Sequence, residues 1–219
     1  MFNLILKDLL VQKKTLPFLG LYIIVFMFAF QSIGTGAFAG ITIAITYQMV
    51  ASASNYDEKA NSDIIMNSMP LDRKAIVLSK YLSVILYFAL ATLGYMAFSI
   101  ILSIIPIPIN IPTITQENLV VAFLGVMVMN SIYYPVYFKM GNIKARIVSF
   151  ILFFGAFFGV ISMLDLINDS QNYQILNTIS TFFNNGTDTQ ILLVMVGGTT
   201  VILLISYVLS VMFYNNREF

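Results

Sequence analysis

Six long apolar runs divide the sequence, and each has about the length needed to cross a lipid bilayer. A membrane-spanning helix needs about 20 consecutive, mostly apolar residues. The six runs are Leu16–Ser32, Ala37–Ala53, Tyr81–Ile105, Leu119–Phe138, Ile147–Leu166 and Ile191–Tyr214. The composition agrees, because only 10% of the residues are charged, against about 25% in a soluble domain. We therefore predict an all-α, polytopic membrane protein in which residues 1–219 form a single transmembrane domain.

The positions of Lys and Arg predict how these spans are oriented. All 11 such residues lie before the first span, between the second and third, between the fourth and fifth, or after the sixth. Short cytoplasmic loops collect Lys and Arg. We therefore expect both termini in the cytoplasm and the segment 167–190 outside the cell, as an extracellular loop.

Several residue types are missing, and their absence narrows the chemistry. The sequence contains no cysteine and no histidine, which removes thiol chemistry and the commonest metal ligand. No acidic or basic residue lies in the middle of a predicted span, Asp165 at the outer end of the fifth being the nearest. Intramembrane charges usually mark ion pathways and proton relays. We therefore predict no catalytic residue and no metal ligand, and the net charge of +1 gives no reason to expect a nucleic-acid partner.

The first fifteen residues have the pattern of a helix that lies on the membrane surface. At helical spacing one face carries apolar residues and the opposite face carries Lys7 and Lys14. The apolar residues are Phe2, Ile5, Leu6 and Leu9. Such an amphipathic helix binds the interface between lipid and water. We predict an interfacial helix over residues 1–15, the alternative being a frayed terminus.

Small residues recur at four-residue spacing at the start of the second span. They are Gly36, Gly40 and Ala44. Small residues at this spacing let helices approach closely in lipid. This face predicts either packing within the chain or contact with a second chain, and the spacing alone does not choose between them.

The segment 55–80 is the longest charged stretch between predicted spans. Asn61 or Ser62 can cap a short helix, and Pro70 ends it. Asp72 can then cap a second helix that meets no proline before the end of the third span. A helix from Asp72 to Ile105 is roughly 50 Å long, so its first turns should stand outside a hydrocarbon core of about 30 Å.

The short helix in this segment carries an apolar patch. Its members are Ile64, Ile65, Met66 and Met69. The patch either packs back on the membrane surface or binds a partner, and both interpretations stay open on physical grounds alone.

Two loops resemble those of a known family. The stretch NSMPLDRKAIVLSKYLS (67–83) resembles a pattern of Ser-Leu-Pro, a gap, Arg, an apolar run and Lys-Tyr-Leu, with Met69 in place of Leu. The stretch YYPVYFKMGNIKAR (133–146) resembles a second loop of the same family, Pro-x-x-Phe-Lys-x-Gly followed by Lys-x-Arg. The chain thus resembles type-2 ABC exporter permeases, especially the permease family of the phenol-soluble modulin exporter of Gram-positive bacteria.

The resemblance implies a function and a site. Residues 61–68 would be the coupling helix, which docks into an ABC ATPase subunit through Asn61, Ser62, Ile64, Ile65, Met66 and Met69, with Glu58 as a polar contact at the base of the second span. The chain has no GxxxxGK[ST] phosphate-binding loop, so ATP and Mg²⁺ would be bound by the separate ATPase and the chain itself would not be an enzyme. A second permease chain, membrane lipid and an amphipathic peptide or lipophilic toxin are the other expected partners, in a bacterial cell membrane.

Two other interpretations compete with this one. The first is a substrate-capture subunit of an ABC-type importer, which would lack a long charged loop with a docking helix such as 55–80. The second is a non-ABC membrane protein, for instance a membrane enzyme, which needs acid, base or metal-binding groups at one depth of the membrane. The sequence shows no such group of residues.

Overall fold

A computed structural model describes residues 2–14, 16–29, 36–69, 72–104, 114–151, 155 and 187–217. Every regular element in these ranges is helical, which confirms the all-α prediction for them. The elements are α1 (Phe2–Val11), the 3-10 turn η1 (Gln12–Lys14), α2 (Leu16–Ala29), α3 (Ala37–Lys59), α4 (Ser62–Ser68), α5 (Arg73–Ile104), α6 (Gln116–Met140), a helix over 142–151, and α9 (Asp188–Asn215).

Four of the described helices are long and apolar enough to cross a membrane: α3, α5, α6 and α9. Helix α2 is also apolar, but its 14 residues cover only about 21 Å. Most of the predicted fifth span, Ile147–Leu166, lies outside the described residues. The total of six spans therefore stays a prediction.

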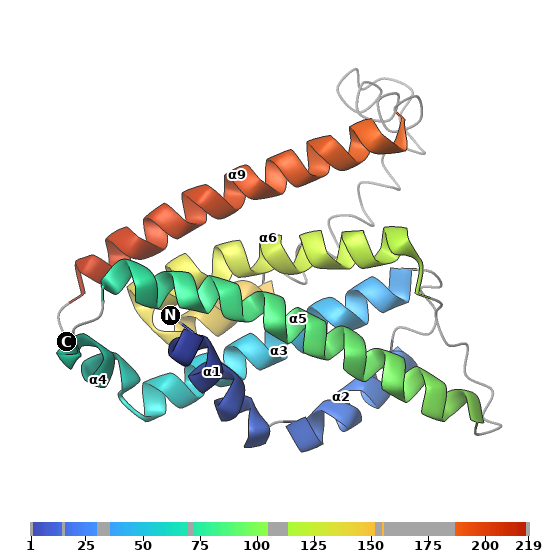
Figure 1. Ribbon diagram of the computed structural model, residues 1–219, viewed down its shortest axis with the longest axis horizontal. Coiled ribbons are helices and arrows are strands. Elements are labelled where there is room, and N and C mark those ends of the chain that lie inside the picture. The colour runs from blue at the N-terminus through green and yellow to red at the C-terminus, as the bar shows by residue number, and fades with distance from the viewer. Residues whose placement is uncertain are drawn as a thin grey trace.

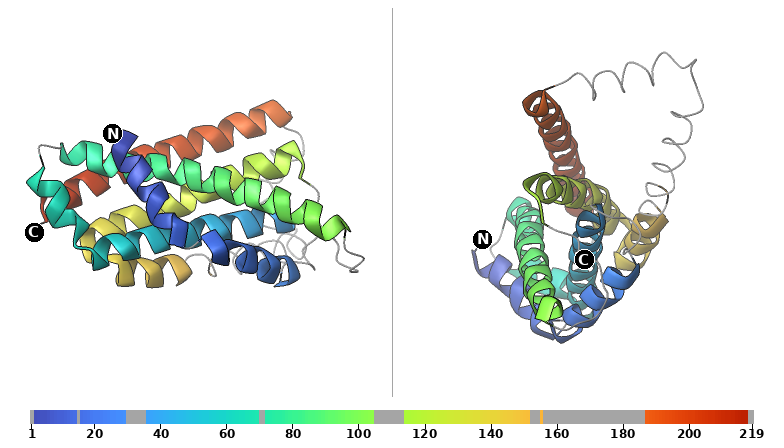
Figure 2. Two further views of the ribbon diagram at one scale, coloured as in Figure 1. Left: turned by 60° about the horizontal axis from the view of Figure 1, so that its bottom comes forward. Right: turned by 90° about the vertical axis from the view of Figure 1, so that its right-hand side faces the viewer.

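Helix α3 lies at the centre of the bundle, and α9 lies at its edge (Figure 1; Figure 2, right). In an apolar 18-residue stretch of α3, 67% of the residues are buried, against 6% in such a stretch of α9. Helix α3 packs against α2, α5 and α6, whereas α9 packs mainly against α6. Glycine allows two of the close approaches, since a Cβ added at Gly125 would meet Ile43 at 2.6 Å and one at Gly94 would meet Leu19 at 2.9 Å.

Helix α5 begins where the sequence predicts it. The Asp72 carboxylate accepts a hydrogen bond from the Lys74 backbone N–H at 3.1 Å, which is the N-cap geometry. The helix has 32 residues and is therefore about 48 Å long. Because this exceeds the hydrocarbon thickness of about 30 Å, part of α5 extends beyond the membrane core. Its first residue, Arg73, donates to the Asn215 carbonyl at the C-terminal end of α9 at 2.8 Å (Figure 1). Asn67 of α4 donates to the neighbouring Tyr214 hydroxyl of α9 at 3.0 Å.

A proline inside α6 determines how α9 is attached. Pro135 lacks a backbone N–H, so the Ser131 carbonyl loses its donor within the helix. The Ser206 hydroxyl of α9 donates to that carbonyl at 2.5 Å, and the Tyr81 hydroxyl of α5 contacts Ser206 Oγ at 2.5 Å. The Ser131 carbonyl, which Pro135 leaves without a backbone donor, thus takes part in a hydrogen-bond chain that joins α6 to α9 and α5.

Candidate functional site

The short helix α4 connects the end of α3 to the start of α5 through a sharp reversal. Asn61 adopts a left-handed conformation with φ 47° and ψ 38°, which Asn tolerates better than most residues. Its side chain makes no capping bond, and the hydroxyl of Ser62 donates instead to Asp57 Oδ1 at 3.1 Å. Asn61 and Ser62 therefore form the turn itself, and Ser62 ties α4 to the last part of α3.

The apolar residues of α4 divide into an outward and an inward set. Ile64, Ile65 and Met69 are 56%, 57% and 54% exposed, whereas Met66 is buried. The Sδ of Met66 lies 4.0 Å from the Lys7 Nζ of α1. Of the predicted apolar patch, three residues are thus available to a partner, and Met66 anchors the helix to the rest of the chain.

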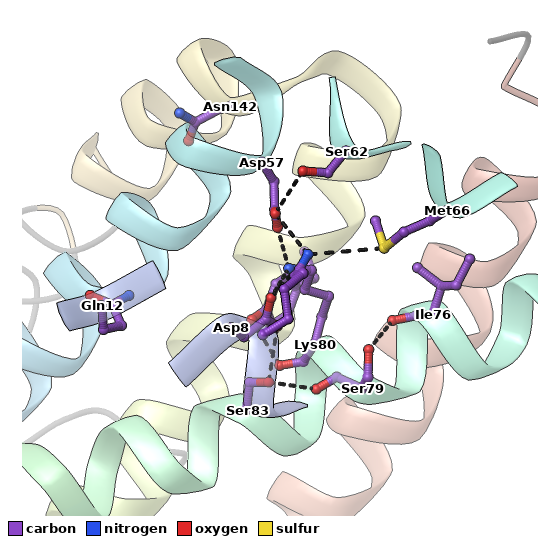
Figure 3. Close-up of polar contacts among 12 residues, drawn as sticks. Asp8, Gln12, Asp57, Ser62, Met66, Ile76, Ser79, Lys80, Ser83 and Asn142 are labelled. Carbon is purple, nitrogen blue, oxygen red and sulfur yellow. Dashed lines mark hydrogen bonds and ion pairs between the residues drawn. The ribbon is translucent and has the colours of Figure 1, made fainter. Parts of the chain in front are cut away.

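A cluster of four charged side chains lies directly beneath α4 (Figure 3). Lys80 Nζ of α5 binds Asp8 Oδ1 of α1 at 2.7 Å and also binds the Asp57 carboxylate of α3. Lys7 Nζ binds Asp57 at 2.8 Å and Asp8 at 3.3 Å. Two cations thus face two anions, and we call these four residues the ion cluster. Lys80, Asp8 and Asp57 are buried, and only the Lys7 side chain is substantially exposed, at 32%.

Neutral side chains complete the hydrogen bonds of the ion cluster. The hydroxyl of Ser83 donates to Asp8 Oδ2 at 3.0 Å, and that of Tyr87 donates to the Asp8 backbone carbonyl at 3.1 Å. The Tyr134 hydroxyl of α6 donates to the Lys80 carbonyl at 2.9 Å. Buried charges persist only when they are paired and hydrogen-bonded. The cluster meets this condition and joins α1, α3 and α5 at one point, with α4 and α6 attached to it.

The predicted contact residue Glu58 lies apart from the ion cluster. Its carboxylate accepts a hydrogen bond from the Asn142 backbone N–H at 3.2 Å, just after Gly141, which has a φ of 85°. The Asn142 side chain in turn accepts from the Tyr133 hydroxyl at 2.9 Å. Glu58 therefore holds the turn between α6 and helix 142–151 against the end of α3, so the two basic segments 55–80 and 139–146 meet in space.

Asp8, Asp57 and Lys80 were not predicted as a site from the sequence. Helical spacing placed Lys7 on the water-facing side of an interfacial helix, but α1 turns this polar side towards α3 and α5 and leaves Leu6 and Leu10 exposed. One signal was present in the sequence, namely an adjacent Lys and Asp in a ten-residue helix whose other residues, apart from Asn3, are apolar. Such residues need partners, but the sequence does not show which ones.

The small residues of α3 are not equally exposed. Ala44 is buried, Gly40 is half-buried and Gly36 is exposed. Since α3 is the central helix of the bundle, packing within the chain accounts for Ala44. A role of Gly36 and Gly40 in contact with a second chain stays a prediction.

These features define a class of protein: a polytopic helical membrane protein whose long helices are joined by a short helix with an exposed apolar face. The chain matches the family described as ABC-2 family transporter protein over residues 3–215, and it belongs to that family. Membership confirms the predicted class of type-2 ABC permease and implies an ABC ATPase as partner. No curated protein and no solved structure matches the chain.

Proposed function

We propose that this chain is the permease subunit of an ATP-driven exporter and that α4 is its coupling helix. The observation that carries the proposal is the outward apolar face of α4, formed by Ile64, Ile65 and Met69 on a short helix between two long apolar ones. Fully burying such a side chain contributes about 1.5–3 kcal/mol. Each is about half exposed, so docking would gain roughly half of that per residue.

The attachment of α4 supports a role in passing on motion. Ser62 binds Asp57 and Met66 meets Lys7, so α4 contacts two members of the ion cluster. The cluster in turn holds α1, α3 and α5. A displacement of α4 by a moving ATPase would therefore act on three elements together. Asp8 and Lys80 would serve as positioning residues in this coupling, because they do not lie on the docking face.

The remaining features of the proposal rest on sequence. The likeness of 67–83 and 133–146 to the permease family of the phenol-soluble modulin exporter supports export, an amphipathic peptide or lipophilic toxin as cargo, and a second permease chain. The distribution of Lys and Arg supports cytoplasmic termini in a bacterial cell membrane. ATP and Mg²⁺ would be bound by the ATPase subunit alone.

The test is recruitment of the ATPase by variants of α4. The full chain is co-expressed with its ABC ATPase, and the ATPase that copurifies is measured relative to the permease in the membrane. Ile65→Asp places an unpaired carboxylate in the docking face, and burying such a group is costly. We expect normal membrane levels and recruitment reduced about tenfold or more, which corresponds to at least about 1.4 kcal/mol. Transport of an amphipathic peptide into inside-out vesicles should fall with it.

The matched control is Ile143→Asp. Ile143 is apolar and 71% exposed, and it lies in the other basic segment, 139–146. Its neighbour Asn142 is buried, so a substitution there would disturb packing and would not be a matched control. We expect this control to recruit the ATPase as the unmodified chain does. Wild-type recruitment by both Ile64→Asp and Ile65→Asp would show that α4 is not the docking element.

A further inference from the structure

A long apolar groove lies between α5, α6 and α9. Its volume is about 860 Å³, within the range of 300–1,000 Å³ that is typical of ligand pockets. It extends along α9 from Leu192 to Tyr207, a rise of about 22 Å. All three helices are candidate membrane spans, so the groove lies at the depth of the lipid chains.

The side chains that line the groove are almost all apolar. No charged residue is among the described residues that line it, and four of them carry hydroxyls. Each of these hydroxyls already has a partner in the chain. Thr199 and Thr200 donate to the carbonyls of Val196 and Gly197 in their own helix. Tyr81 contacts Ser206 and Ser210, and Tyr207 donates to a carbonyl of α5. A ligand that needs hydrogen bonds would find few here, whereas an alkyl chain needs none.

The groove is also long enough for an extended acyl chain. It runs about 22 Å along α9, which exceeds one leaflet of the hydrocarbon core, about half of 30 Å. An acyl chain of a lipid in one leaflet therefore fits within its length.

One end of the groove carries a positive charge. Lys74 is exposed and lies one helical turn before the groove residue Leu78 on α5. The hydroxyl of Tyr207, which also lines the groove, donates to the Lys74 carbonyl at 3.4 Å. A Lys side chain at the end of a membrane helix extends its ammonium to the headgroup level. The groove thus ends beside a cation at the depth where phospholipid headgroups lie.

We propose that this groove binds an acyl chain of an anionic phospholipid, whose headgroup pairs with Lys74. The apolar wall takes the hydrocarbon, and the ammonium selects an anionic headgroup over a zwitterionic one. One Lys near an anionic membrane surface supplies a preference of about fivefold. The proposal is independent of export and of the ATPase, and it assigns a function to a surface that neither the docking helix nor the ion cluster uses.

Fluorescence quenching tests the site directly, because the chain contains no tryptophan. Leu203→Trp places the fluorophore in the groove, and Ile205→Trp is the control on the same helix, at nearly the same depth, with an exposed side chain outside the groove. The full chain is placed in phosphatidylcholine nanodiscs that contain brominated phosphatidylglycerol or, in a parallel series, brominated phosphatidylcholine. No ATPase or ATP is present.

We expect brominated phosphatidylglycerol to quench Leu203→Trp at about fivefold lower mole fraction than brominated phosphatidylcholine, and Ile205→Trp to show no such preference. Adding Lys74→Gln should remove the preference at Leu203→Trp. Ile85→Trp, on the α5 side of the groove, repeats the measurement if Leu203→Trp does not fold.

Three results would overturn the proposal. Equal quenching by the two lipids at both positions would mean that the groove contacts only bulk lipid. Absence of quenching at Leu203→Trp, with normal quenching at Ile205→Trp, would mean that protein fills the groove. A preference that survives Lys74→Gln would remove the role of this lysine.

Discussion

Replacing Lys80 by Met tests whether the ion cluster holds the N-terminal helix to the bundle. Met has a similar length and no charge, so the change removes the ammonium with little loss of volume. Asp8 and Asp57 would then keep one cationic partner, Lys7, whose side chain is 32% exposed. Both carboxylates are buried and would be left with half of the positive charge that now faces them.

We expect a large loss in free energy of unfolding, because the carboxylates of Asp8 and Asp57 stay buried after their main cationic partner is removed. Removing one member of a buried ion pair typically costs about 3–5 kcal/mol, whereas replacing the whole group by neutral residues is often close to neutral. Since Lys7 stays in place, we expect Lys80→Met to cost about 3 kcal/mol in free energy of unfolding. The triple variant Asp8→Asn, Asp57→Asn, Lys80→Met should recover much of this loss, because the one charge that remains, on Lys7, belongs to the member of the cluster that reaches water.

The assay is denaturant unfolding of the purified full chain in mixed micelles. Lys59→Met is the control, since Lys59 is exposed at the end of α3 and such surface changes stay within about 0.5 kcal/mol. If Lys80→Met is no more destabilising than Lys59→Met, the cluster is not a stabilising link. If the triple variant is less stable than the single one, the argument from unpaired charge is wrong. Release of α1 in Lys80→Met should also appear as faster amide hydrogen exchange in residues 2–11.

Two further predictions concern topology and helix attachment. In this cysteine-free chain, Gln116→Cys should react with a membrane-impermeant maleimide on intact cells, while Lys59→Cys should react only after permeabilisation; the reverse pattern would contradict the orientation deduced from Lys and Arg. Ser206→Ala leaves the Ser131 carbonyl without the donor it receives from α9, so we expect a loss of about 1–3 kcal/mol in unfolding free energy, against little change for Thr200→Ala, whose hydroxyl bonds only within its own helix.

The sequence was sufficient for the features that depend on neighbouring residues. Asp72 caps α5 as predicted, and the absence of proline from Asp72 to Ile105 fits the long helix that the structure shows. A short helix between Asn61 and Pro70 was also predicted from capping and proline, and α4 occupies Ser62–Ser68; the bounds 61–68 came from the family resemblance. Helix caps, helix-breaking prolines and apolar runs are set by residues that are close together in the chain. They can therefore be predicted from a single sequence.

The sequence was not sufficient for the ion cluster, because its members are distant along the chain. Asp8 and Asp57 meet Lys80 only when α1 crosses the junction of α3 and α5 (Figure 1; Figure 3). Periodicity shows that α1 has a polar side, but it does not show whether water or protein faces that side. The inward turn of Met66 was missed for the same reason, since a seven-residue helix gives no reliable period.

The attachment of α9 is uneven along its length, and most of the groove lies along its less hydrogen-bonded part. Among the described residues, the hydrogen bonds from α9 to other helices begin at Ser206 and continue towards its C-terminal end. From Asp188 to Ile205, α9 meets its neighbours through apolar contacts, which in lipid lack a hydrophobic driving force. An outward displacement of the N-terminal half of α9 would therefore break no hydrogen bond to another described helix. If the groove binds an acyl chain as proposed, straight, branched and unsaturated chains would fit it at similar cost, and Lys74 at its hydrogen-bonded end, not the shape of the chain, would decide which lipid is retained.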